Sequence, residues 1–95
     1  MTKKDLIRRI AARTGHSQGT VLAVLDSFTE STEEALSQGQ PVSIPGFGKF
    51  DLAYRSARSA RNPRTGEQMT VHAKISPKFI PGKRLKAAAQ AVPTA

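Results

Sequence analysis

Residues 55–66 repeat arginine at every third position and end in two turn-forming pairs, Asn62-Pro63 and Thr65-Gly66. Apolar residues alternate with other residues on both sides of this stretch, at Phe50, Leu52 and Tyr54 before it and at Met69, Val71, Ala73 and Ile75 after it. A period of two is typical of a β-strand, while proline and glycine oppose the alternative, a helical turn. We therefore expect an extended β-hairpin arm over about residues 53–74, with the arginines near its tip.

The spacing of the arginines predicts where they point. Because side chains alternate along a strand, Arg55 and Arg61 should face one way, and Arg58 and Arg64 the other. Only serine and alanine lie between the first three of them, so we expect the arm to lack an apolar face. Such an arm should stand away from the body and be mobile until a ligand surrounds it.

The charge of the chain is concentrated in its second half. The net charge is +8, and residues 49–95 hold ten of the fifteen basic side chains but only Asp51 and Glu67 as acids. A strongly basic protein suits nucleic acid, an acidic membrane face or an acidic protein partner. A generally basic solvated surface would spread its charge evenly, so we favour a localised binding surface.

Length and composition limit the class of protein. The chain has 95 residues and no cysteine, which indicates one small domain without disulfides or a thiolate metal site. A single copy of this size buries little surface, so dimerisation is expected. No apolar run approaches the roughly 20 residues of a membrane-spanning helix, and the first twenty residues lack a signal-peptide core. The sequence indicates an intracellular protein with no membrane partner.

Two helices are predicted in the first half. Thr2 and Asp5 have the spacing of a capping box before a helix over about residues 3–14, and Ser17 is a natural N-cap for a second helix that ends at Gly39. The second helix is apolar over a wide surface that includes Phe28. Its charges are all acidic, so we expect it to lie away from any nucleic acid. These charges are Asp26, Glu30, Glu33 and Glu34.

The middle of the chain predicts a three-stranded meander. A short alternation, Val42 and Ile44, precedes the turn at residues 45–48, and two long strands then continue into the arm. We interpret Phe47, Phe50 and Phe79 as core or dimer-interface residues, because base-stacking surfaces usually interleave aromatic with basic residues. Helices followed by this meander indicate an α+β fold.

A short helix is predicted from Gly82, and residues 91–95 should fray. Its first turn holds Lys83, Arg84 and Lys86, a placement that the helix dipole disfavours. We interpret these cations as a phosphate site joined to the free N–H groups of the helix start. Scattered surface lysines remain the alternative.

The sequence offers no catalytic or metal-binding constellation. His16 follows Gly15 at a helix junction, and His72 falls on the polar side of its strand with Thr70 and Lys74, so both are expected to be surface residues. The glycines around Phe47 do not form a phosphate-binding loop of the nucleotide-hydrolase type. We therefore expect no enzyme activity, no cofactor, no metal and no small-molecule substrate.

Three motifs together resemble the bacterial histone-like DNA-binding proteins, the HU and IHF family, most closely HU. They are the Pro45-Gly46-Phe47-Gly48-Lys49-Phe50 turn, the arm with its Arg61-Asn62-Pro63-Arg64-Thr65-Gly66 tip, and the set Phe79, Gly82, Leu85 and Lys86. The resemblance covers residues 1 to about 90. It implies an intertwined dimer with a helical base, a saddle of three-stranded antiparallel sheets and two extended arms that reach around DNA.

The resemblance also implies roles for individual residues. Pro63 matches a proline that, in this family, wedges between base pairs. Arg58, Arg61 and Asn62 match minor-groove residues, and Lys3, Lys83 and Lys86 match contacts to flanking phosphates. Two positions depart from the family pattern, because Ala60 replaces a common glycine and Ala53 a common basic residue. The full set of predicted DNA-binding residues is Lys3, Arg55, Arg58, Arg61, Asn62, Pro63, Arg64, Lys74, Lys83, Arg84 and Lys86, and the predicted dimer core is Phe28, Phe47, Phe50 and Phe79.

The sequence thus predicts a cytoplasmic, nucleoid-associated homodimer that binds and bends double-stranded DNA with little sequence preference. Arginines in the minor groove sense groove width and A·T content better than sequence. One alternative is a subunit of a site-specific IHF-like heterodimer with a related chain. Another is an RNA-associated basic protein, which would explain the charge but not the proline-tipped ribbon.

Overall fold

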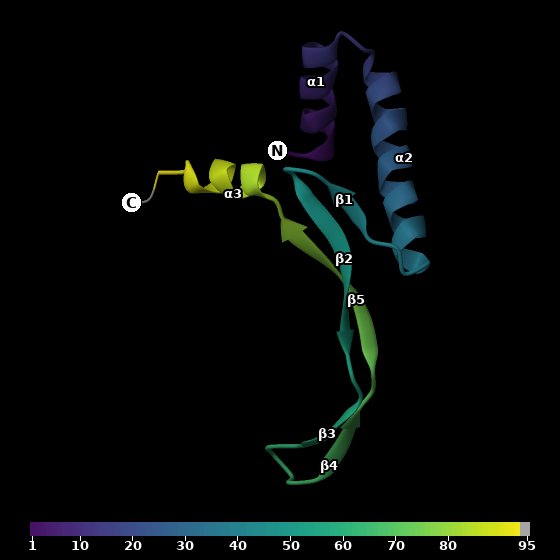
Figure 1. Ribbon diagram of the computed structural model, residues 1–95, viewed down its shortest axis with the longest axis vertical. Coiled ribbons are helices and arrows are strands. Elements are labelled where there is room, and N and C mark those ends of the chain that lie inside the picture. The colour runs from purple at the N-terminus through teal and green to yellow at the C-terminus, as the bar shows by residue number, and fades with distance from the viewer. Residues whose placement is uncertain (94–95) are drawn as a thin grey trace. The chain divides into compact units, whose positions relative to one another are not determined.

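The structure of the protein, a computed structural model, describes residues 1–93, apart from the side chains of Arg58, Ala60 and Val71. It contains three helices and five strands (Figure 1). The chain divides into two compact units, residues 1–34 and 35–95, with the boundary inside the second helix. The α+β class expected from the sequence is confirmed.

Helix α1 spans Lys3–Thr14 and has both ends capped. The Thr2 hydroxyl accepts a hydrogen bond from the Asp5 backbone N–H at 3.3 Å, and the Asp5 carboxylate accepts one from the Thr2 N–H at 3.0 Å. At the other end Gly15, at φ 77°, donates its N–H to the Ala11 carbonyl. The predicted capping box and the predicted bounds of this helix are confirmed.

Helix α2 spans Gln18–Ser37. The Ser17 hydroxyl accepts from the Thr20 N–H at 3.1 Å, which is the expected N-cap geometry. Gly39, at φ 75°, donates to the Leu36 carbonyl after the last turn. Glycine fits here because left-handed backbone costs it nothing.

The three-stranded sheet contains β1 (Val42–Ile44), β2 (Gly48–Arg55) and β5 (Lys74–Pro81), in the order β1-β2-β5 and antiparallel throughout. A tight turn joins β1 to β2, where the Phe47 N–H donates to the Ile44 carbonyl and Gly46 has φ 82°. Pro77 lies within β5 opposite Leu52. It is tolerated because β5 is an edge strand, which leaves some N–H groups without a ladder partner.

The arm is a separate two-stranded ladder of β3 (Arg58–Arg61) and β4 (Gln68–Val71). The expectation of uninterrupted strands is wrong, because Ser56, Ala57, His72 and Ala73 belong to no strand. None of these four residues is β-branched, so their cross-strand pairs stabilise a sheet only weakly. Both ladders nevertheless share one register, since Arg55 pairs with Lys74 and Arg58 with Val71.

Helix α3 spans Lys83–Gln90 and begins against the turn that joins β1 to β2. The Gly82 N–H donates to the Phe47 carbonyl at 2.7 Å, and the Arg84 N–H donates to the Gly46 carbonyl at 3.0 Å. A Cβ atom on Gly82 would lie 2.8 Å from backbone atoms of Gly46 and Phe47, so this close approach requires glycine. The helix ends before residue 91, as expected, and the fraying of the tail stays a prediction because residues 94 and 95 are outside the description.

Burial within one chain is slight. Among the residues whose side chains are described, Ile7 and Val21 are the only buried hydrophobic ones, with 8% and 6% of their surface exposed. Several large apolar side chains remain open, including Phe28, Phe47 and Phe79 at 38–44%. Within the same described part of the chain, no helix is long and apolar enough to cross a membrane.

Candidate nucleic-acid interface

The β2–β5 hairpin has one charged face. Paired residues of antiparallel strands point to the same side, and successive residues point to opposite sides. The pairs Asp51–Lys78 and Arg55–Lys74 therefore share a face, and Lys49 joins them because it lies two residues before Asp51. We call this the basic face, and its charged members are Lys49, Asp51, Arg55, Lys74 and Lys78.

The opposite face of the same hairpin is apolar. It carries the pairs Phe50–Phe79, Leu52–Pro77 and Tyr54–Ile75. Tyr54 and Ile75, where the hairpin leaves the body, are 69% and 66% exposed, and farther out Met69 is 49% exposed. The shared register of the two ladders keeps position 69 in phase with position 75.

The prediction that the arm is charged on both sides and lacks an apolar face is therefore only partly right, because position 58, an arginine, shares this side of the ribbon but apolar residues lie on it too. It was based on the outgoing strand, where serine and alanine separate the arginines. The returning strand supplies Met69 and Ile75 to one side of the ribbon. The alternation of that strand, already visible in the sequence, was the signal that should have indicated this face.

The predicted arginines divide between ladder and turn. Arg55 pairs with Lys74 and Arg61 with Gln68, and the common register puts both arginines in phase, as expected. Arg58 lies in β3, but its side chain is outside the described part of the structure. Arg64 lies in the tip turn and belongs to no strand face, so the expected pairing of its direction with that of Arg58 does not apply.

The arm tip is a closed turn that displays Pro63. The Asn62 N–H donates to the Glu67 carbonyl and the Gly66 N–H to the Asn62 carbonyl, both at 2.8 Å. The Asn62 side-chain oxygen accepts from the Arg64 N–H at 2.9 Å, so this amide holds the turn together. Pro63 and Arg64 are exposed, whereas Asn62 is half-buried. The predicted tip residues are thus brought together on a turn fixed by its own hydrogen bonds.

The start of α3 presents three exposed cations, Lys83, Arg84 and Lys86, with no acid in the first turn. The expectation that free helix N–H groups join them in a phosphate site is wrong for Arg84, whose N–H is bonded to Gly46. The stem of Arg84 lies close to Gly46, where its Cδ would be 3.0 Å from an added Cβ. The turn at residues 45–48 therefore holds the backbone at the start of this helix, and the Arg84 stem lies beside it.

Lys3 is paired with the acidic helix. Its Nζ lies 2.6 Å from Asp26 Oδ1, and both side chains are about half exposed. Exposed ion pairs contribute only about 0–1 kcal/mol, so this pair leaves Lys3 able to bind a phosphate. Asp26 of α2 thus pairs with a predicted DNA-binding lysine, and the expectation that α2 lies away from nucleic acid stays a prediction.

The sequence interpretation missed Lys49 and Lys78, which lie on the basic face beside Asp51. The Leu52 N–H donates to Asp51 Oδ1 at 2.8 Å, and this bond, aided by the charges of Lys49 and Lys78, lowers the pKa of Asp51 despite some desolvation. The alternation of Lys74, Ser76 and Lys78, out of phase with Ile75 and Phe79, was the signal for Lys78.

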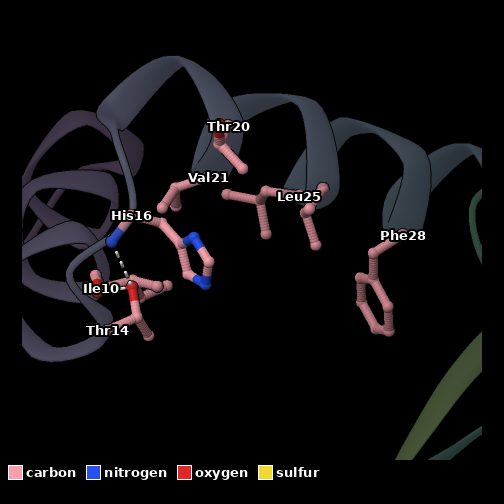
Figure 2. A pocket seen from close by; sticks show the side chains of 8 residues that line it. Ile10, Thr14, His16, Thr20, Val21, Leu25 and Phe28 are labelled. Atoms are coloured by element: carbon pink, nitrogen blue, oxygen red, sulfur yellow. Dashed lines mark hydrogen bonds between the residues drawn. The ribbon is translucent and has the colours of Figure 1, made fainter.

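The predicted dimer core is only partly gathered within one chain. Phe79 lies 5.8 Å from Phe47 and 4.9 Å from Phe50 between ring centroids. Gly48 makes room for this cluster, because a Cβ there would lie 2.3 Å from the Phe79 ring. Phe28, in α2, lies instead at one end of an apolar groove (Figure 2).

This groove has a volume of about 520 Å³ and lies between α1 and the first part of α2. Figure 2 shows the His16 ring beside Val21. The His16 backbone N–H donates to the Thr14 hydroxyl at 3.3 Å. His16 and His72 are both exposed, as expected. No group of three or more potential metal ligands occurs among residues 1–93. The residues that line the groove are Ile10, Thr14, His16, Thr20, Val21, Val24, Leu25 and Phe28.

Comparisons with known proteins agree with this geometry. Residues 1–90 match the family model described as bacterial DNA-binding protein. The chain is similar to the DNA-binding protein HU of Thermotoga maritima, with 43% identity over 90% of this chain and 96% of the relative. It is also similar to integration host factor subunit beta of Escherichia coli, with 40% identity over 90% of this chain and 93% of that subunit.

Solved structures extend the similarity to the fold. An HU–DNA cocrystal structure from Anabaena matches with a TM-score of 0.81 and 34% identity, covering 97% of this chain and 100% of that one. HU from Thermotoga maritima matches with a TM-score of 0.65 and 34% identity, covering 94% and 98%. Both matches include the arm, because they cover nearly the whole of each chain.

Proposed function

Because this chain belongs to the bacterial DNA-binding protein family, we propose that it binds double-stranded DNA as an architectural protein and bends it with little sequence preference. The observation that carries the proposal is the two-faced hairpin. Its basic face offers Arg55, Lys74 and Lys78 to phosphates, and its tip displays Pro63 between Arg61 and Arg64.

The charge arrangement suits a duplex approached through its backbone. Phosphates supply most of the affinity in sequence-tolerant binding, and each neutralised phosphate makes log K fall by about 0.9 per decade of salt. Arginines that reach the minor groove add sensitivity to its width, because the pattern of donors and acceptors there is degenerate. This chemistry explains affinity for duplex DNA without a base code.

The working unit of the proposal is a homodimer. One chain buries only Ile7 and Val21 among its described hydrophobic side chains and leaves Phe47 and Phe79 about two-fifths exposed. It also leaves open the apolar groove next to Phe28 (Figure 2). A second copy would cover these surfaces and would place a second arm on the DNA.

The arm tip supplies the bending step. Pro63 has no charge and no N–H, so it cannot add to electrostatic attraction. Members of this family insert apolar wedges between base steps, and the bend that results lets more of the duplex contact the protein. The closed turn at residues 62–67 would hold Pro63 outward for that insertion.

Pro63→Ala and Arg61→Ala separate the wedge from the charge. Pro63→Ala should reduce the bend, measured by fluorescence energy transfer between the ends of a bound duplex, and leave the salt dependence of binding unchanged. Arg61→Ala should weaken all duplexes and flatten the salt dependence by about 0.9 per phosphate lost. Equal end-to-end distances for Pro63→Ala and the parent protein would refute the wedge.

A site-specific heterodimer is the second candidate, and the similarity to integration host factor subunit beta favours it. In that case the chain alone should bind random duplex poorly and gain affinity with a related subunit. Titration of the purified chain against random and selected duplexes distinguishes the two. Equal affinity for both kinds of duplex supports the homodimer.

The role we propose is structural and not catalytic, with no cofactor and no small-molecule substrate. It requires access to chromosomal DNA, so the place of action is the nucleoid of a bacterial cytoplasm. Relatives named as DNA-binding proteins support this assignment. Immunoprecipitation of the protein with chromosomal DNA after crosslinking tests it, and recovery without DNA would contradict it.

A further inference from the structure

The body end of the basic face holds a carboxylate between two lysines. Asp51 lies opposite Lys78 in the ladder, and Lys49 Nζ lies 3.6 Å from Asp51 Oδ2. Asp51 is the only acid in the sequence of β2 and β5, which otherwise contribute Arg55 and Lys74 to this face. A single acid at this place lowers the positive charge where a phosphate would approach.

The carboxylate is fixed in position. Strand β1 reaches only as far as the pair Val42–Phe50, so beyond that point β2 has no neighbour on its β1 side. Asp51 Oδ1 accepts the Leu52 N–H at 2.8 Å, which satisfies a donor at this open edge. The other oxygen faces Lys49, and the Asp51 side chain is only 25% exposed. These two contacts hold the carboxylate on the basic face beside Lys49.

The two lysines differ in how strongly they are engaged. Lys49 forms the ion pair with Asp51, whereas Lys78 influences the carboxylate only through its charge across the strands. Opposed side chains in a ladder have Cβ atoms about 5 Å apart, which is well within the Debye length of about 10 Å at 0.1 M salt. Any phosphate bound to Lys78 is therefore repelled by Asp51.

We propose that Lys78 and Lys49 form a phosphate-binding site on the body of the protein and that Asp51 limits the strength of this site. The ligand is a phosphodiester group of duplex DNA, so the inference rests on the proposed function. Asp51 weakens the hold of the body on every duplex. Discrimination between straight and deformed DNA then depends more on the arms.

The test compares Asp51→Asn, Lys78→Ala and the double variant with the parent protein. Asparagine keeps an oxygen that can accept the Leu52 N–H and removes only the charge. Glu33→Gln is the matched control, because it removes the same charge from α2 and leaves the side chains of β2 and β5 unchanged. The affinity for a labelled random duplex is measured by fluorescence anisotropy at salt concentrations from about 0.05 to about 0.3 M. In this range the salt dependence reports the number of phosphate contacts.

Each phosphate contact makes log K fall by about 0.9 for a tenfold rise in salt. One contact therefore contributes about an eightfold higher affinity at 0.1 M salt than at 1 M salt. Asp51→Asn should raise the affinity by up to this factor per subunit and steepen the salt dependence, while Lys78→Ala should do the reverse. In the Lys78→Ala background the gain from Asp51→Asn should shrink, because the two changes act on one site.

Two results would overturn the proposal. One is an Asp51→Asn protein that binds as the Glu33→Gln control does, and the other is an equal gain with and without Lys78. Lys78 is exposed, so Lys78→Ala leaves folding intact and provides a second test if Asp51→Asn is unstable. Arg61→Ala in the same assay separates failure of the phosphate site from failure of the proposed DNA-binding function. If Arg61→Ala also leaves binding unchanged, the proposed function fails. If Arg61→Ala weakens binding and the other variants do not change it, only the phosphate site at Lys49 and Lys78 fails.

Discussion

Because Gly82 lies so close to the turn at residues 45–48, Gly82→Ala tests whether an added methyl group raises or lowers the free energy of unfolding. Gly82 has φ −85° and ψ 175°, an extended conformation that alanine adopts without strain. At an open position with such a backbone, replacing glycine by alanine stabilises a protein by about 0.4–1 kcal/mol through the unfolded chain. The added Cβ, however, would lie 2.8 Å from the Gly46 carbonyl carbon and oxygen and from the Phe47 carbonyl carbon.

All three of these atoms are backbone atoms, so either the turn or α3 must move. The movement would weaken the hydrogen bonds from the Gly82 N–H to Phe47 and from the Arg84 N–H to Gly46, at 2.7 and 3.0 Å. Overpacking costs about 1–3 kcal/mol, and this cost includes the weakening of the two bonds. After the unfolded-state gain is subtracted, we expect Gly82→Ala to destabilise the protein by about 1–2 kcal/mol.

Urea denaturation followed by circular dichroism measures this change, at one fixed protein concentration because association adds to stability. Gly19→Ala is the control: it lies in α2, and its added Cβ would meet only the Ser17 hydroxyl, at 4.0 Å. This variant should be more stable than the parent by roughly 0.5 kcal/mol. If Gly82→Ala is also stabilising, the close contact does not exist and the reasoning fails.

Three further changes test other parts of the structure. Thr2→Ala should lower the free energy of unfolding by about 1 kcal/mol because the Asp5 N–H loses the Thr2 hydroxyl as its acceptor, and an unchanged midpoint in urea titration would contradict this. The Thr2 hydrogen bonds lower the pKa of Asp5, so its stabilising effect is present above about pH 3.9 and is lost as pH falls through the folded-state pKa. The difference in midpoint between the parent and Asp5→Asn should therefore shrink from pH 6 to pH 2, and a constant difference would exclude the linkage. Phe79→Ala removes the ring that contacts both Phe47 and Phe50 and should cost about 3 kcal/mol, enough to favour separated chains by light scattering; an unchanged dimer would show that the cluster does not support association.

The sequence predicted local structure better than relationships across strands. Thr2, Ser17 and Gly15 determine helix ends through contacts within four residues, and such signals can be recognised from spacing alone. The apolar face of the arm depends on which residues of the returning strand lie opposite the arginines. The alternation of that strand marks its apolar positions in the sequence, but which of them lie opposite the arginines follows only from the register of Arg55 with Lys74.

The site showed the same difference between local and distant signals. The closed turn around Pro63 could be predicted from Asn-Pro and Thr-Gly. The bond from the Arg84 N–H to the Gly46 carbonyl joins positions nearly forty residues apart, so no local sequence signal indicates that this helix N–H is already used. Lys78 was missed because its importance comes from Asp51 across the ladder.

The small amount of apolar surface that one chain buries also affects how long an unpaired chain survives in a cell. With only Ile7 and Val21 buried among its described hydrophobic residues, a lone chain gains little free energy by folding. If the protein is a dimer, as proposed, folding is coupled to the association of two chains. Each tenfold rise in chain concentration then adds about 1.4 kcal/mol to the apparent free energy of unfolding. Newly synthesised chains that have not met a partner remain substrates for proteases, whereas paired chains are protected. The steady-state amount of the protein should therefore respond more than proportionally to its rate of synthesis.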